Sequence, residues 1–141
     1  MNKKFEIIPE DASVRVHVWG RTVRELFCNA LAGLAAYMKP DAVPLSKNQQ
    51  QATQEISIET VDLNSLLVDF LSGVIAHADS KGAVFTGVTF KKFGENFLSG
   101  ELAGIATDRF ENEIRAVSYS DVDVRKNPRT GLYEALLTFE V

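Results

Sequence analysis

The chain has 141 residues, of which 45% are hydrophobic and 24% charged, a composition typical of one globular domain. No apolar run approaches the roughly 20 residues that a membrane-spanning helix needs, and no apolar segment follows the N-terminal lysines as in a signal peptide. We therefore expect a cytoplasmic protein that does not contact a membrane. The net charge of −4 disfavours broad binding to a nucleic-acid backbone, and the one cysteine, Cys28, excludes an internal disulfide.

The first half of the chain predicts strands around two helices. Strands are expected over 5–8, 14–19 and 55–61, helices over 23–38 and 63–81, and a polar loop over 41–53. The first two strands are expected to pair as a hairpin with a polar turn at its tip. Thr22 and Glu25 have the spacing of a capping box, and Asp62 can cap the second helix, which Gly82 follows. Each predicted helix carries one apolar stripe.

The second half of the chain predicts strands alone. They are expected over 84–93, 97–107, 113–124 and 132–141, with turns over 94–96 and 127–131. The run Glu113–Val124 alternates, with Ile114 and Ala116 on one side and Arg115 and Val117 on the other, which favours a strand. The predicted order is ββ-α-β-α-ββββ. We expect one α+β domain over 1–141, with two amphipathic helices and a mainly antiparallel mixed sheet.

The usual enzyme signatures are absent from the sequence: it has no Walker loop, no Gly-x-Gly-x-x-Gly, no His-Glu-x-x-His and no Cys-x-x-Cys. The remaining candidates are carboxylates, namely Glu10 and Asp11 on the early turn and Glu140 beside the terminal carboxylate of Val141. Oxygen donors of this kind suit Ca²⁺, Mg²⁺ or Mn²⁺. Composition alone favours a solvated turn and a frayed terminus over a metal site. Cys28 lies at the edge of an apolar stripe, which indicates a packing residue.

The sequence resembles the archease family along its whole length. The resemblance rests on five phrases in the family's order: Phe5-Glu6 leading into Glu10-Asp11-Ala12-Ser13, the helix start Gly20–Ala30, the helix phrase Leu66–Leu71, the phrase Glu113–Ser120, and the terminus Glu140-Val141. Archeases assist the RtcB-type RNA ligase of tRNA splicing and RNA repair, promoting its guanylylation and multiple turnover. The resemblance therefore implies a chaperone-like activator that is not itself an enzyme and that meets RNA only through its partner.

The resemblance also implies where a divalent metal such as calcium would bind. In the family the turn aspartate and the C-terminal residues hold it; the corresponding residues here are Ser13, Glu140 and Val141, with Asp11 as a substitute donor. Several motif positions are changed from the family pattern. Glu10 stands where the family has the turn histidine, Arg115 replaces a lysine, Ser118 a threonine and Ser120 a histidine. We expect Glu10, Glu113, Arg115, Ser118 and Ser120 to face the partner or to belong to the motif.

Two other readings remain open at the level of the sequence. A serine hydroxyl is a poorer ligand for a hard cation than a carboxylate, so the chain can be a protein-binding adaptor that kept the scaffold and lost the metal. A metal-dependent hydrolase that uses Asp11 and Glu140 is a third reading, which lacks a visible general base. The activator and the adaptor readings share one structural prediction: the early turn meets the C-terminus, with roughly 4 to 6 Å between the side-chain oxygens of Ser13 and Glu140.

Overall fold

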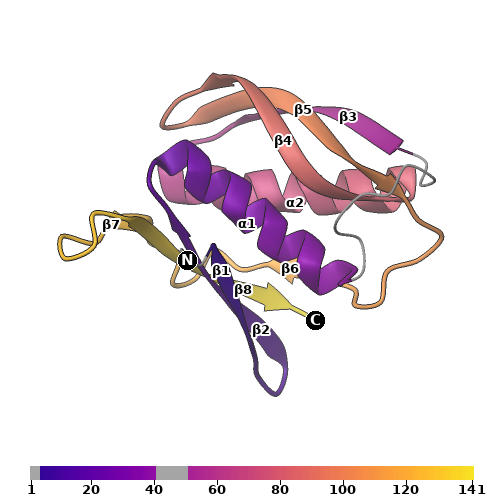
Figure 1. The fold of residues 1–141 in the computed structure, drawn as a ribbon, viewed down its shortest axis with the longest axis horizontal. Coiled ribbons are helices and arrows are strands. Elements are labelled where there is room, and N and C mark those ends of the chain that lie inside the picture. Colours follow the sequence, from indigo (N-terminus) through magenta and orange to yellow (C-terminus); the bar gives the residue numbers. More distant parts are fainter. Residues whose placement is uncertain (1–3, 41–50) are drawn as a thin grey trace.

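A computed structural model of the chain describes residues 4–40 and 51–141 (Figure 1). Its elements are β1 (Phe5–Pro9), β2 (Ser13–Gly20), α1 (Val23–Met38), β3 (Gln51–Glu59), α2 (Leu63–Lys81), β4 (Ala83–Phe93), β5 (Phe97–Ala106), β6 (Ala116–Val117), β7 (Arg125–Lys126) and β8 (Tyr133–Glu140). Their order is the predicted one, with one additional short strand, β7. The α+β class is confirmed.

Both helices begin and end where the sequence predicts, because their capping residues act locally. At α1 the Thr22 hydroxyl accepts from the backbone N–H of Glu25 at 3.0 Å, and the Glu25 carboxylate accepts from the N–H of Arg21 at 3.1 Å. At α2 the Asp62 carboxylate accepts from the N–H of Ser65 at 2.8 Å. Gly82 ends α2 in the left-handed conformation, with φ of 66°.

The strands form two separate antiparallel sheets, which corrects the prediction of one mixed sheet. The five-stranded sheet has the order β1-β2-β8-β6, with β7 also paired to β8, and the three-stranded sheet has the order β3-β5-β4. Strands β1 and β2 form the predicted hairpin, as do β4 and β5. The later strands are not successive hairpins, because β6 and β7 both pair with β8.

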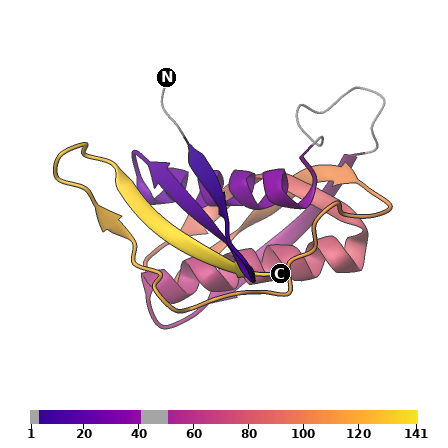
Figure 2. The ribbon, with the colours of Figure 1, turned by 90° about the horizontal axis from the view of Figure 1, so that it is seen from below.

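The two helices lie between the two sheets (Figures 1 and 2). Helix α1 packs on β2 and β4, and α2 packs on β3 and β4. The helix-facing sides of β2 and β8 are apolar and buried, with Val14, Val16 and Val18 on one strand and Ala135, Leu137 and Phe139 on the other. Because side chains alternate along a strand, the intervening residues of β2 and β8 lie on the opposite, outer face of the five-stranded sheet. That outer face carries the polar residues considered below.

Several predicted boundaries differ from the structure, among them that of the strand expected over 55–61, which is β3, Gln51–Glu59. Of the predicted strand 113–124, the structure pairs Ala116–Val117 alone as β6, and Asp121 has a φ of 67°, which ends any extended run. The predicted loop over 41–53 also ends too late, since Gln51 already belongs to β3. Residues 41–50 lie outside the described residues. Strand β3 begins in polar sequence because every second residue of this edge strand faces solvent.

Candidate functional site

The early turn and the C-terminal end of the chain meet at one corner of the five-stranded sheet. Strands β2 and β8 are paired so that Ser13 lies directly opposite Glu140, and β6 pairs so that Ala116 lies opposite Glu140 from the other side. The backbone N–H of Arg115 donates to the Glu140 carbonyl at 2.7 Å. Figure 2 shows the tip of the β1–β2 hairpin beside the C-terminus. The early turn and the C-terminus are therefore adjacent, as the predicted site requires.

Directly opposite residues of an antiparallel pair carry their side chains on the same face, with Cβ atoms about 5 Å apart. Ser13 is half-buried, whereas Glu140 and Val141 are exposed. The Ser13 hydroxyl and the Glu140 carboxylate can therefore share a small ligand on the outer face. Their use as ligands stays a prediction.

The acidic turn next to Ser13 forms an ion pair with a basic side chain of the same protein, Arg15. The Arg15 guanidinium lies 3.1 Å from the Glu10 carboxylate through Nε and 3.7 Å from the Asp121 carboxylate through a terminal nitrogen. The Glu10 N–H also donates to the Ser13 carbonyl at 2.9 Å, which closes the turn. Glu10 thus faces Arg15, while Asp11 is exposed on the same turn.

The other predicted residues, Glu113, Ser118 and Ser120, flank β6 along the chain and do not lie at the corner itself. The N–H of Ser118 donates to the Thr138 carbonyl at 2.9 Å, two residues before Glu140, and the N–H of Ser120 donates to the Ser118 hydroxyl at 3.0 Å. Glu113 is exposed and lines a separate hollow of about 250 Å³ with Asp79 and Arg115. The corner itself therefore consists of Ser13, Glu140 and Val141, with Arg115 joined to Glu140 by its backbone hydrogen bond.

The donors at this corner are all hard oxygens, which matches the chemistry of Ca²⁺, Mg²⁺ or Mn²⁺. Among the described residues no group of three or more His, Cys, Asp or Glu side chains converges on one point. Any cation here would need the Ser13 hydroxyl and the oxygen atoms of Val141 in addition to Glu140. The Arg15 guanidinium, two residues from Ser13 on the same face, would oppose it. The donor set fits a weakly held cation.

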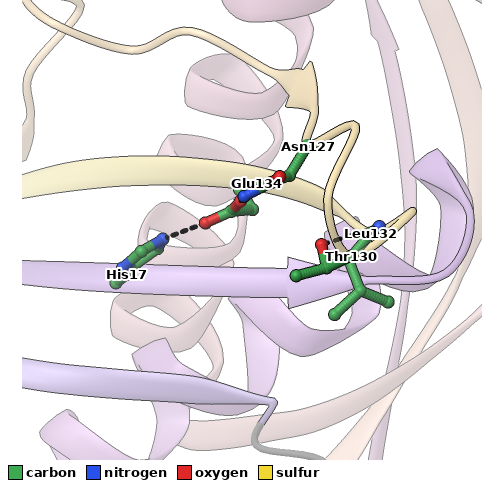
Figure 3. A network of polar contacts seen from close by, with 5 residues as sticks. All are labelled: His17, Asn127, Thr130, Leu132 and Glu134. Carbon is green, nitrogen blue, oxygen red and sulfur yellow. Dashed lines mark hydrogen bonds and ion pairs between the residues drawn. The ribbon is translucent and has the colours of Figure 1, made fainter.

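A polar network that the sequence does not predict lies further along the outer face (Figure 3). Glu134 on β8 accepts from the imidazole Nε2 of His17 on β2 at 2.8 Å and from the side-chain amide of Asn127 at 2.6 Å. The Asn127 bond is the main cause that lowers the pKa of Glu134 below its ordinary value, and the His17 bond adds to it. His17 stacks on Trp19, with 4.0 Å between ring centroids. The only sequence signal was the alternation of β2 and β8, which puts these residues on one face.

This network forms one wall of a hollow of about 600 Å³. The opposite wall is the turn between β7 and β8, and the lining includes Arg125, Lys126, Pro128, Arg129 and Leu136. The sequence predicts only a turn over 127–131 here. In the structure, residues of this turn line the hollow together with His17, Glu134 and Leu136 of the outer face.

The surroundings of Cys28 do not activate its thiol as a nucleophile. Burial, and secondarily the nearby Glu25 carboxylate, raise the pKa of its thiol, which keeps it protonated at neutral pH. This agrees with the packing role that the sequence predicts. No helix of the described residues is long and apolar enough to cross a membrane.

Comparison with known proteins gives one consistent family. The model of the Archease protein family matches residues 5–141. The protein archease of Methanosarcina mazei is 29% identical over 132 residues, which cover 88% of each chain. The solution structure of Methanobacterium thermoautotrophicum protein 1598 superposes with a TM-score of 0.69 at 21% identity, covering 97% of this chain and 98% of that one. The crystal structure of a Thermotoga maritima archease, described as a possible chaperone, superposes with a TM-score of 0.64 at 17% identity, covering 100% and 98%.

Proposed function

Because the chain belongs to the archease family, we propose that it is an accessory protein that activates an RtcB-type RNA ligase and does not itself catalyse a reaction. The proposed action is to promote guanylylation of the ligase, and so its multiple turnover, in tRNA splicing or RNA repair. We place this action in the cytoplasm, where the free thiol of Cys28 stays reduced. RNA is reached through the ligase, in keeping with the net charge of −4.

The observation that carries the proposal is the pairing of Ser13 with Glu140. It brings the early turn and the C-terminal residues, which lie at opposite ends of the sequence, to one exposed corner. In this proposal Ser13, Glu140 and Val141 hold a divalent cation, with Asp11 as a further donor on the flanking turn. A bound cation would supply positive charge and open coordination positions to an anionic group of the partner. Glu113, Arg115, Ser118 and Ser120 extend the same edge and are proposed to face the ligase.

The test is a guanylylation assay with the ligase encoded in the same genome. The wild-type protein should accelerate formation of the ligase–guanylate adduct and permit multiple turnover. Glu140→Ala should lose most of this effect, because it removes the side-chain carboxylate of the corner. Glu95→Ala, which removes an exposed acid from the β4–β5 turn on the other sheet, is the matched control and should stay active. A wild-type protein that neither binds the ligase nor changes its guanylylation would refute the proposal.

A second candidate is a metal-free adaptor that binds the ligase or a related protein. The observation that favours it is the contact of Arg15 with Glu10 and Asp121, which puts a fixed guanidinium at the corner where a cation would bind. The two candidates differ in one result. If Glu140→Ala and chelator-treated wild type both bind the ligase with unchanged affinity and still activate it, the adaptor is correct and the cation is dispensable.

A further inference from the structure

The hollow beneath the β7–β8 turn has the size of a small-molecule site and lies away from the Ser13–Glu140 corner. Its volume of about 600 Å³ falls within the range of roughly 300 to 1,000 Å³ that ligand sites occupy. Its lining residue Glu134 lies on the same strand as Glu140, six residues earlier, which corresponds to about 20 Å along β8. A ligand in the hollow would therefore not contact the corner.

Positive charge is concentrated at the rim of this hollow. Residues 125–133 contain Arg125, Lys126 and Arg129 and no acidic residue, in a chain whose net charge is −4. Arg125 forms an ion pair with the Asp123 carboxylate. Within the described part of the chain, neither Lys126 nor Arg129 takes part in an ion pair, although the Lys126 ammonium lies 5.9 Å from the centre of the Tyr133 ring. Two cations at the rim are thus available to an anion.

The turn that carries Arg129 is held by its own hydrogen bonds. The Asn127 side-chain oxygen accepts from the N–H of Arg129 at 2.9 Å, and the Asn127 carbonyl accepts from the N–H of Gly131 at 2.8 Å. The N–H of Asn127 donates to the Leu132 carbonyl at 2.7 Å, and the N–H of Leu132 donates to the Thr130 hydroxyl at 3.1 Å (Figure 3). A turn fixed in this way loses little backbone entropy when a ligand binds to it.

Glu134, the other acidic residue that lines the hollow besides Asp123, takes part in hydrogen bonds. Both carboxylate oxygens of Glu134 accept hydrogen bonds, one from His17 and the other from Asn127. Asn127 therefore connects the two walls: its amide nitrogen binds Glu134 and its amide oxygen fixes the turn. The lining holds three basic and two acidic side chains, so its net formal charge is +1, and Lys126 and Arg129 are the two basic residues that form no ion pair within the described part of the chain.

We propose that this hollow binds a phosphate group carried by a ligand of nucleotide size. A phosphate offers several charged oxygens that can be shared between the fork of an arginine and the ammonium of a lysine. Leu136 and Pro128 provide apolar surface in the same hollow for a sugar or a base. The phosphate can belong to a free nucleotide or to the backbone of a single-stranded nucleic acid. This inference does not depend on the proposed ligase activation.

The experiment is a titration of the full chain, at low ionic strength, with inorganic phosphate, AMP, adenosine and the oligonucleotide pentauridylate, followed by calorimetry and by amide chemical shifts. AMP, pentauridylate or both should bind saturably and shift the amide signals of Asn127, Arg129 and Gly131, and adenosine should not. The double variant Lys126→Ala/Arg129→Ala should weaken this binding about tenfold or more. The matched control Lys91→Ala/Lys92→Ala removes the same charge from exposed positions of β4 on the other sheet and should bind as wild type does.

The outcomes separate the sources of the phosphate and test the site. Binding of AMP identifies a free nucleotide as sufficient, whereas binding of pentauridylate alone identifies backbone phosphates. The proposal is overturned if no phosphate ligand binds, if adenosine binds as well as AMP, or if the two double variants lose affinity equally. Chemical shifts in the wild type report the location without any variant. Divalent-cation titration of the Lys126→Ala/Arg129→Ala protein should match wild type, so failure here leaves the proposed function untouched.

Discussion

The side chain of Glu134 accepts a hydrogen bond from His17 across 2.8 Å, although the two residues are separated by 117 positions in the sequence. Glu134 also accepts from Asn127, so one carboxylate joins β2, β8 and the turn after β7. The side chains of His17 and Glu134 remain 34% and 23% exposed, which leaves the network open to solvent exchange. Its contribution to stability should therefore be measurable but modest.

Substitution of Glu134 should make stability less dependent on pH. The pKa of Glu134 is lowered in the folded protein, first by Asn127, so its stabilising effect is complete above its ordinary value of 4.5 and is lost as the pH falls through the folded value. Glu134→Gln should reduce the free energy of unfolding by about 1 kcal/mol at pH 7. Urea unfolding at pH 7, 5 and 3 should show this difference shrinking below pH 4.5. A difference that is constant over this range would contradict the assignment.

The two glycines Gly104 and Gly87 should respond in opposite ways to a methyl group. A Cβ added at Gly104 on the central strand β5 would overlap the Val84 carbonyl oxygen, whereas one added at Gly87 on β4 meets no atom within 4 Å. Gly104→Ala should cost about 2 kcal/mol or more, because backbone has to move. Gly87→Ala should stay within about 0.5 kcal/mol of wild type or be slightly more stable. Thermal or urea unfolding of both variants measures the contrast, and equal effects would refute it.

Asn29 should be the more important of two asparagines that make the same kind of bond. Its amide nitrogen donates to the Trp19 carbonyl at 2.7 Å, and the residue is 8% exposed. Asn29→Ala should destabilise the protein by about 2 kcal/mol, because it leaves a carbonyl without its partner and opens a small void. Asn112 donates to the Tyr37 carbonyl at 2.9 Å but is exposed, so Asn112→Ala should cost less than about 1 kcal/mol. The reverse order of stability would show that burial does not decide the cost.

Cation affinity at the corner should rise when its charge is made more negative. Ser13→Asp adds a carboxylate opposite Glu140, and Arg15→Gln removes the guanidinium beside it. Each change should strengthen Ca²⁺ or Mn²⁺ binding about tenfold in calorimetric titration. Glu140→Ala in the Ser13→Asp background should abolish the gain. If Ser13→Asp binds no better than wild type, the cation part of the proposed function is wrong, whatever the ligase assay shows.

The sequence predicts the features that local chemistry determines. The helix boundaries follow from Thr22, Asp62 and Gly82, whose capping geometry involves only residues within one turn. The β1–β2 hairpin also follows from a short alternating pattern on each side of a polar turn. The division into two sheets does not, because it depends on which strands meet across the helices.

The segment Glu113–Val124 shows why alternation alone is an unsafe guide. Its buried residues are Ile114, Val117 and Val122, at intervals of three and five, although the sequence alternates between two sets. Pairing with β8 is confined to the part around β6, and a turn with a positive φ at Asp121 interrupts the segment. Similarly, Ser13 and Glu140 can be proposed as neighbours from a family resemblance, but Glu134 and His17 cannot be joined by any local pattern.

The position of β8 between β2 and β6 imposes an order on biosynthesis. A ribosome adds 117 residues between His17 and Glu134, which takes roughly 6 to 25 s at ordinary elongation rates. During that interval β1 is the one native partner of β2 that has been synthesised, so the other edge of β2 would present unmatched amides and carbonyls. Nascent chains halted before β8 should consequently be prone to aggregate, and the five-stranded sheet should assemble only after translation has passed its last strand.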